Sequence, residues 1–198
     1  MKLAGLILAG GASTRMGSPK ALLVYRGETF LDRLIGLLAK HCSPVIVVLG
    51  HEAEAIRGGL KRAAEATIVL NPNYPEGQLS SLQCGLAAVP AGVDGVLFTP
   101  VDYPAVAETT VIALVAALER SAGLLVVPRF EGRHGHPICC TRDLIPEFLA
   151  LERESQARVV VHRHASETCY VDLDDPGVVL DVDDPKVYRD LIGASERP

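Results

Sequence analysis

Residues 3–20 read LAGLILAGGASTRMGSPK, a short apolar run that passes directly into a glycine-rich segment. The apolar part, Leu3–Ala9, is interpreted as a buried strand and not as a signal peptide. A strand that ends in such a turn often holds phosphate, because glycine lets backbone N–H groups approach an anion. Gly10, Gly11 and Gly17 supply that path. The stretch therefore favours an α/β fold that binds a phosphorylated ligand.

Two cations, Arg15 and Lys20, lie in the same segment, where they would neutralise phosphate charge that backbone dipoles alone cannot. The segment is neither a P-loop, which needs Gly-Lys followed by Ser or Thr, nor the dinucleotide fingerprint G-x-G-x-x-G. Pro19 also disfavours a helix that starts directly at Gly17, as both motifs require. An ordinary strand-to-helix turn with solvated charges is the alternative. The combination of Arg15, Gly17 and Lys20 favours phosphate binding over that alternative.

Similar apolar, β-branched runs recur along the chain, separated by longer segments with helical spacing of apolar residues. This alternation predicts a three-layer, Rossmann-like α/β fold with an open, mostly parallel sheet. Capping residues predict one helix after Thr29 and another after Thr109 or Thr110. The expected strands are Leu3–Ala9, Val45–Leu49, Thr67–Leu70, 95–98 and 124–127.

The C-terminal third has a less regular pattern. A length of 198 residues and the absence of an interdomain linker predict one domain over residues 1–198, with a frayed tail at 193–198. Residues 155–164 are ambiguous, and we favour a helix over a strand. The other expected elements are a strand at Ile138–Thr141, a helix at 142–151, short strands at 170–173 and 178–182, and a helix from Pro185.

Composition limits the partners of the chain. A net charge of −5 without a block of Lys or Arg argues against a nucleic-acid partner. No apolar run approaches the roughly 20 residues that cross a bilayer, so no membrane partner is expected. The five cysteines lack the spacing of a zinc site or a disulfide framework, which fits a reducing cytoplasm. We therefore expect a cytoplasmic protein that acts on a small molecule.

Asp102 follows the predicted strand at 95–98 by a few residues. Ligands of open α/β sheets bind at the carboxyl ends of the strands, and a carboxylate there is a natural ligand for Mg²⁺ beside a triphosphate. An aspartate that caps the next turn is an equally good interpretation of this residue alone. An acidic cluster between Asp172 and Asp184 offers a second ligand, although most of its members are expected to be solvated turn residues.

The pattern L-A-G-G-x-S-x-R-M-G-x-x-K at residues 8–20 resembles the signature of the MobA-like nucleotidyltransferase family. That family includes molybdenum cofactor guanylyl- and cytidylyltransferases and is related to sugar-phosphate nucleotidyltransferases. The resemblance implies the nucleotide-diphospho-sugar transferase type of fold. It also implies base contacts from the first three residues of the pattern, phosphate contacts from residues 11–17, and catalytic roles for Arg15 and Lys20. The implied nucleotide-binding residues in the loop are Leu8, Ala9, Gly10, Gly11, Ser13, Arg15, Gly17 and Lys20.

The resemblance also implies a metal site. Residues 102–104 are similar to the family's Asp-x-Pro element, which makes Asp102 a metal ligand and part of the catalytic group. Residues 181–185 resemble its Asp-Ile-Asp-Thr-Pro element, which makes Asp183 the second ligand. Asp181 stays open as an alternative, because residues 186 and 187 depart from the family's Glu-Asp pair. The implied ion is Mg²⁺, with Mn²⁺ as a substitute.

Two further segments resemble the family. Residues 77–82 are similar to the segment that contacts ribose and base, which adds Ser80 and Ser81 to the binding residues; their Ser-Ser-Leu form is closer to the cytidylyltransferases than to the guanylyltransferases. A cap on the following helix is a second interpretation of both serines, and it is compatible with the binding role. Residues 132–137 are similar to the Gly-x-x-Gly-His-Pro element of the cytidylyltransferase branch, which places His136 near the acceptor.

The sequence hypothesis is a Mg²⁺-dependent transfer of CMP from CTP to a phosphate-bearing acceptor, with molybdenum cofactor as the specific acceptor and pyrophosphate as the product. The expected partners are a nucleoside triphosphate, that acceptor, and a molybdoenzyme or chaperone. The rivals are a sugar- or polyol-phosphate nucleotidyltransferase and a nucleotide-binding regulatory module without turnover. The sequence leaves open the base, the acceptor, the oligomeric state and the role of His136.

Overall fold

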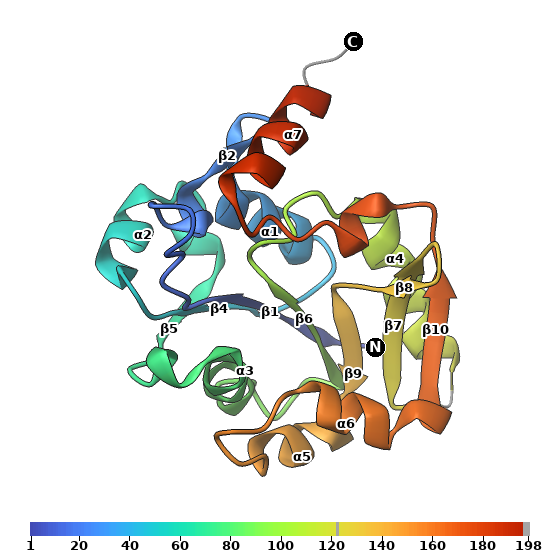
Figure 1. Ribbon diagram of the computed structural model, residues 1–198. Helices are drawn as coiled ribbons and strands as arrows, with labels where there is room; N and C mark the ends of the chain where they lie inside the picture. The colour runs from blue at the N-terminus through green and yellow to red at the C-terminus, as the bar shows by residue number, and fades with distance from the viewer. Residues whose placement is uncertain (122, 196–198) are drawn as a thin grey trace.

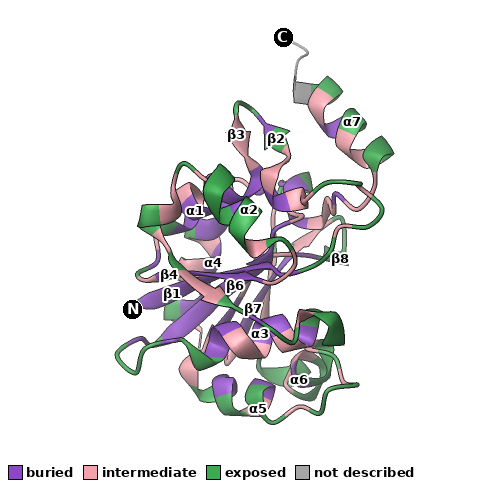
Figure 2. Cartoon of the chain, turned by 90° about the vertical axis from the view of Figure 1, so that its left-hand side faces the viewer, coloured by how far each residue is buried: buried purple, intermediate pink, exposed green. Residues whose placement is uncertain are grey.

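A computed structural model of the protein describes residues 1–121 and 123–195. An eight-stranded sheet forms the middle of the molecule, and helices cover both of its faces (Figures 1 and 2). The predicted three-layer, mostly parallel α/β fold is thereby confirmed. In spatial order the strands are β10 (Thr168–Asp172), β7 (Leu125–Phe130), β9 (Ile138–Thr141), β6 (Gly95–Pro100), β1 (Leu3–Ala9), β4 (Val45–Leu49) and β5 (Thr67–Leu70), with β8 (Arg133–His134) paired to β7.

Strand β1 lies between β4 and β6 and runs parallel to both. β5 is parallel to β4 and β10 is parallel to β7, whereas β9 runs antiparallel to its neighbours β6 and β7. All seven residues of β1 are buried, which explains why its sequence is apolar throughout instead of alternating. The glycine-rich segment therefore starts in the middle of the sheet's carboxyl edge, where open α/β sheets bind ligands.

Helices α1, α2 and α4 lie on one face of the sheet, and α3, α5 and α6 lie on the other (Figures 1 and 2). Helix α7 lies beside a small hairpin of β2 (Val24–Tyr25) and β3 (Glu28–Thr29), where Tyr188 Oη donates to the carbonyl oxygen of Val24 at 2.9 Å. The helices are α1 (Phe30–Ala39), α2 (Ala53–Gly59), α3 (Gln78–Ala87), α4 (Glu108–Arg120), α5 (Ile145–Leu149), α6 (Arg158–Arg163) and α7 (Pro185–Ser195).

Two hydrophobic cores, one on each face, hold the layers together. Alternate residues of β1 belong to different cores, because successive side chains of a strand point to opposite faces. Leu3 and Ile7 pack with α1 and α4, and Leu6 and Leu8 pack with α3 and α5. The strand before the glycine-rich segment is thus fixed from both sides.

Two predicted helix starts had different outcomes. Thr29 caps α1 as expected, since its Oγ1 accepts from the backbone N–H of Asp32 at 3.0 Å. The predicted cap at Thr109 or Thr110 is wrong, because α4 begins at Glu108 after Ala107. Thr110 Oγ1 instead donates to the buried carboxylate of Asp175 at 2.6 Å.

The predicted strand at 178–182 is also wrong. Residues Pro176–Val179 form a 3₁₀ turn, and their backbone groups bond to neighbouring loops instead of a strand. The carbonyl oxygen of Val178 accepts from His136 N–H at 2.8 Å, and Val182 N–H donates to the carbonyl oxygen of Asp102 at 2.9 Å. These bonds remove the donors and acceptors that a sheet ladder would use.

The other predictions for the C-terminal third agree better with the structure. A helix within residues 155–164 is confirmed by α6, and the helix expected at 142–151 consists of a 3₁₀ turn, Arg142–Leu144, followed by α5. Helix α7 starts at Pro185 as predicted and includes residues 193–195, while residues 196–198 lie outside the described part of the chain. Within the described residues, no helix combines the length and the apolar composition that a bilayer span requires.

Candidate functional site

The glycine-rich loop between β1 and Lys20 has a defined backbone path. Ser13 and Gly17 have positive φ angles of 49° and 68°, a backbone conformation that is strained for residues other than glycine. Met16 N–H donates to the Ser13 carbonyl oxygen at 2.9 Å, and Lys20 N–H donates to Ser13 Oγ at 3.1 Å. These two bonds fold the loop back, so that Lys20 lies near its start.

Small residues let the loop pack closely against the rest of the site. A Cβ placed on Gly10 would lie 2.7 Å from Ser81 Oγ, and one on Gly50, after β4, would lie 2.5 Å from Tyr74 Cβ. His51 N–H also donates to the carbonyl oxygen of Gly10 at 3.1 Å. The ends of β1 and β4 and the start of α3 therefore meet at this point.

Ser80 and Ser81 lie inside the first turn of α3, whose N-cap is Gly77, so the alternative that they cap this helix is wrong. Asn71 Nδ2 donates to Ser80 Oγ at 2.9 Å and to Ser81 Oγ at 3.1 Å. Sequence reasoning missed Asn71, although its position directly after an apolar strand was the available signal. This buried amide orients both serines.

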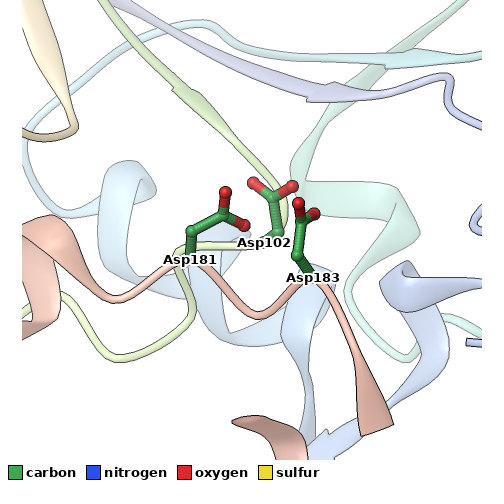
Figure 3. Close-up of side chains that lie close together, drawn as sticks. All are labelled: Asp102, Asp181 and Asp183. Atoms are coloured by element: carbon green, nitrogen blue, oxygen red, sulfur yellow. The ribbon is translucent and has the colours of Figure 1, made fainter. Parts of the chain in front are cut away.

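Three carboxylates meet beside the loop. Figure 3 shows the side chains of Asp102, Asp181 and Asp183 directed toward one another from two segments of the chain. One oxygen of each lies within 4.8 Å of an oxygen of the others. The bond from Val182 N–H to the Asp102 carbonyl oxygen holds the segments together. The structure thus brings both candidates for the second ligand, Asp181 and Asp183, to Asp102.

The two cations of the loop contact these carboxylates. Lys20 Nζ donates to Asp102 Oδ2 at 3.2 Å and also to Asp183 Oδ1. Arg15 donates to the other oxygen of Asp183 at 2.9 Å. The side chain of Lys20 is 11% exposed and that of Arg15 is 68% exposed, so Lys20 is the enclosed cation.

The charges shift one another's pKa values. Burial raises the pKa of Asp102 although Lys20 lowers it, and burial together with the charges of Asp102 and Asp183 raises the pKa of Asp181 to about 6. The hydrogen bond from Lys20 lowers the pKa of Asp183. Burial lowers the pKa of Lys20, but its bonds to Asp183 and Asp102 outweigh this effect and the pKa is raised. The cluster therefore favours cations.

The carboxylates fit a divalent cation. Asp102 Oδ1 and Asp181 Oδ1 are buried, and neither has a hydrogen-bond partner among the described residues. A buried carboxylate oxygen without a partner is costly, and carboxylate oxygens are the ligands that Mg²⁺ and Mn²⁺ prefer. A cation between these side chains would satisfy both oxygens.

A cavity of about 450 Å³ joins the loop to the carboxylates. Gly17 and Ser80, both in the described part of the chain, lie outside its lining. The lining also contains residues that sequence reasoning did not single out, among them Ile56, Tyr74 and Tyr103. The predicted site residues that line it are Leu8, Ala9, Gly10, Gly11, Ser13, Arg15, Lys20, Ser81, Asp102 and Asp183.

A second cavity of about 710 Å³ adjoins the first and shares Tyr103 and His136 with it. The two rings pack with their centroids 4.8 Å apart, and burial lowers the pKa of His136 to about 4. His134 and Tyr170 stack in the same cavity with a centroid distance of 4.8 Å. His136, which the sequence placed near an acceptor, thus lies where the two cavities meet.

Comparison with known sequences gives a family and several relatives. Residues 5–168 match the family model described as the MobA-like NTP transferase domain. The chain is 28% identical to the molybdenum cofactor cytidylyltransferase of Escherichia coli K12, over 97% of this chain and 95% of that protein. It is 32% identical to the nicotine blue oxidoreductase of Paenarthrobacter nicotinovorans, over 93% and 94%. It is 31% identical to the molybdenum cofactor guanylyltransferase of Sinorhizobium fredii NGR234, over 81% and 75%.

Solved structures agree in fold. The protein Rv0371c of Mycobacterium tuberculosis H37Rv superposes with a TM-score of 0.84 at 29% identity, over 98% of both chains. A structure of its complex with manganese superposes with a TM-score of 0.80 at 27% identity, over 98% of this chain and all of the other. The metal in that complex of the structural neighbour is in keeping with the carboxylate cluster described above.

Proposed function

The chain belongs to the family of MobA-like NTP transferase domains, and on that premise we propose that it transfers CMP from CTP to the phosphate of molybdenum cofactor and releases pyrophosphate. The coarser conclusion, that the protein is a nucleotidyltransferase, follows from the family. The nucleotide, the ion Mg²⁺ and the acceptor are the parts that we propose.

One observation supports this proposal most strongly. Lys20, Asp102 and Asp183 come from three distant parts of the sequence and meet in one cavity beside the glycine-rich loop. A module that only binds nucleotide has no need of an enclosed lysine between two carboxylates. A transferase needs cationic groups and a metal site at the phosphates, because negative charge builds up there in the transition state.

The proposed transfer is an in-line displacement. An oxygen of the acceptor phosphate attacks the α-phosphorus, the bond between the α- and β-phosphates breaks, and the electron pair leaves with pyrophosphate. The protein has little proton transfer to perform, because the acceptor is already an anion. Alignment by the loop and charge stabilisation by Lys20 and Arg15 are the contributions of the chain. Mg²⁺ held by Asp102 together with Asp181 or Asp183 would neutralise phosphate charge.

The two cavities suggest where the substrates bind. We place the nucleotide in the first cavity, with the base against residues 8–10 and Ser81 and the phosphates within the loop. The acceptor is placed in the second cavity, whose wall of Tyr103 and His136 faces the first. The stacked pair His134 and Tyr170 offers flat, partly apolar surfaces to a ring system there.

The serines at the start of α3 and the relatives bear on the choice of nucleotide. The Ser80-Ser81-Leu82 form and the E. coli relative named a cytidylyltransferase favour CTP. The S. fredii relative named a guanylyltransferase favours GTP. Both serines are ordered by Asn71, so they present a fixed pattern of polar groups at the start of α3. The base must therefore be tested directly.

The decisive experiment incubates the protein with each of the four ribonucleoside triphosphates and Mg²⁺, with and without molybdenum cofactor, and measures pyrophosphate release. We expect release with CTP only when the cofactor is present, and a product that contains CMP by mass spectrometry. Release with GTP instead would change the base, and release with sugar- or polyol-phosphates in place of the cofactor would change the acceptor.

A complete absence of pyrophosphate with all triphosphates and acceptors would overturn the proposal and favour a regulatory nucleotide-binding module. Pyrophosphate release also separates the proposed reaction from the redox activity in the name of the P. nicotinovorans relative. A molybdoenzyme or chaperone that takes up the product is a further proposed partner.

A further inference from the structure

We propose that Lys20 takes the place of the divalent cation while no nucleotide is bound, so that the metal site opens only when a triphosphate draws Lys20 away. This inference rests on the proposed function for the position of the nucleotide, but it concerns the order in which nucleotide and metal bind. It makes Lys20 a gate for the metal in addition to a phosphate contact.

The position of the ammonium group supports this role. Lys20 Nζ lies 3.2 Å from Asp102 Oδ2 and is also bonded to Asp183 Oδ1, so it bridges the two carboxylates that would hold the metal. The side chain is 11% exposed, and its backbone N–H is anchored on Ser13 Oγ. The ammonium group occupies one oxygen of each carboxylate, Asp102 Oδ2 and Asp183 Oδ1, so a second cation at these carboxylates would lie close to its positive charge.

The charges around Lys20 make its ammonium group and the divalent metal ion competitors for the same carboxylates. The charged groups that face Lys20 are Asp102, Asp181 and Asp183, together with Arg15, which bonds to Asp183. The negative charges of the three carboxylates and the positive charges of Lys20 and Arg15 nearly cancel. A divalent cation that entered with Lys20 in place would be repelled at short range in a partly buried site, where screening by water is weak.

A bound triphosphate would change this balance. Its oxygens would offer Lys20 another set of acceptors in the same cavity, and the carboxylates would then become free for the metal. Nucleotide and cation would thus bind with positive coupling, and by linkage each must raise the affinity for the other by the same factor. The free protein would hold little metal of its own.

The test is a titration with Mn²⁺ alone, in which the EPR signal of free Mn²⁺ reports binding without any nucleotide. We expect the wild type to bind Mn²⁺ weakly and Lys20→Met to bind it about tenfold more tightly or better, because the competing ammonium group is gone. Lys40→Met is the control, since Lys40 is exposed and pairs with Glu108 outside the cavity. It should bind Mn²⁺ as the wild type does. Adding Asp102→Asn to Lys20→Met should abolish the gain.

The titration is then repeated with a CTP analogue that has a methylene group between the α- and β-phosphates. The wild type should gain more Mn²⁺ affinity than Lys20→Met, because the site of the variant is already open. A titration of the analogue without protein subtracts the Mn²⁺ that the free triphosphate binds. A folded Lys20→Met variant with wild-type Mn²⁺ affinity would overturn the inference. Equal Mn²⁺ affinity of the wild type with and without the analogue would overturn it as well.

Two precautions keep these outcomes interpretable. Circular dichroism establishes that each variant is folded, and Lys20→Gln replaces Lys20→Met if the latter does not fold. The comparison of the wild type with and without the analogue does not depend on any variant. The metal-only titration is independent of turnover. Tighter Mn²⁺ binding by Lys20→Met, together with a wild type that releases no pyrophosphate, would support the gate and contradict the proposed transfer reaction. Normal turnover by the wild type, together with unchanged Mn²⁺ binding by Lys20→Met, would do the reverse.

Discussion

Asp102 is the side chain on which the proposed chemistry depends most. It is partly buried, one of its oxygens is bonded to Lys20, and the other has no hydrogen-bond partner among the described residues. Replacing it with asparagine keeps the shape but removes the negative charge that a divalent cation requires. The amide can still accept from Lys20, so the local packing need not change.

We predict that Asp102→Asn lowers turnover by about 10²–10³-fold while the fold is retained, by analogy with the loss of one charge-stabilising group in other active sites. Pyrophosphate release measures the rate, and thermal unfolding reports the fold. Asp174→Asn, an exposed aspartate outside the cavity, is the matched control. A normal rate in the Asp102 variant would exclude its role as a metal ligand.

His136 gives a prediction about pH. Burial lowers its pKa from 6.5 to about 4, so the folded protein keeps the imidazole neutral where the unfolded chain protonates it. Between these values the unfolded state binds more protons, and the free energy of unfolding therefore falls as the pH falls from about 6.5 to 4. The full loss from this group is about 3 kcal/mol.

Urea unfolding of the wild type and of His136→Gln between pH 7 and 4.5 tests this. The variant should have a flatter dependence of stability on pH, because glutamine does not titrate. His162→Gln, at an exposed histidine of α6, should leave the slope as it is in the wild type. Parallel curves for the wild type and the His136 variant would show that His136 is not the group that titrates.

Among the elements, the segment of residues 175–184 leads into α7 and positions two of the three carboxylates. Apart from the 3₁₀ turn at 176–179, it is neither a helix nor a strand. Asp175 fixes its start: its carboxylate is buried and accepts from Ala107 N–H at 2.9 Å, Thr110 Oγ1 at 2.6 Å and Gly177 N–H at 2.9 Å. It thereby ties this segment to the first turn of α4. The expectation that most of the acidic cluster is solvated does not hold for Asp175.

We predict that Asp175→Ala destabilises the protein by about 3 kcal/mol, because it leaves buried donors without an acceptor. It should also reduce turnover, since the segment with Asp181 and Asp183 loses its anchor. Urea unfolding and pyrophosphate release measure the two effects. Asp174→Ala, at the exposed neighbouring position, should change neither. A stable Asp175→Ala variant would mean that other contacts suffice to hold this segment.

Across the whole molecule, the contact of α3 with the sheet sets the distance between the base side of the site and the glycine-rich loop. Gly85 allows the contact: a Cβ there would lie 2.3 Å from Leu6 Cδ1 of β1 and 2.8 Å from Val48 Cγ2 of β4. The same helix places Ser81 against Gly10. Packing in the core on this face and the shape of the site are therefore linked.

Gly85→Ala should destabilise the protein by about 1–3 kcal/mol through overpacking, even though alanine favours helices. It should also weaken nucleotide binding, because α3 must move away from β1. Unfolding and calorimetric titration with a CTP analogue measure these effects. Gly92→Ala is the control, since a Cβ there meets no atom within 4 Å. Unchanged nucleotide affinity in a destabilised Gly85 variant would show that packing in this core does not determine the shape of the site.

The sequence by itself determined the local features: the buried strand Leu3–Ala9, the glycine-rich segment with its two cations, the cap at Thr29, and Asp102 beyond the end of β6. Each depends on the residue types and spacing within one short segment. The layered, mostly parallel sheet could be predicted for the same reason, because buried parallel strands carry a distinctive apolar pattern.

Only the tertiary structure decided which distant groups meet. The bridge from Lys20 to Asp102 and Asp183, the bonds from Asn71 to Ser80 and Ser81, and the place of His136 between two cavities depend on the order of strands and on how loops cross their ends. The 3₁₀ turn at residues 176–179, which overlaps the predicted strand at 178–182, has the same origin. Apolar spacing specifies what is buried, whereas the packing of the layers determines which polar groups become partners.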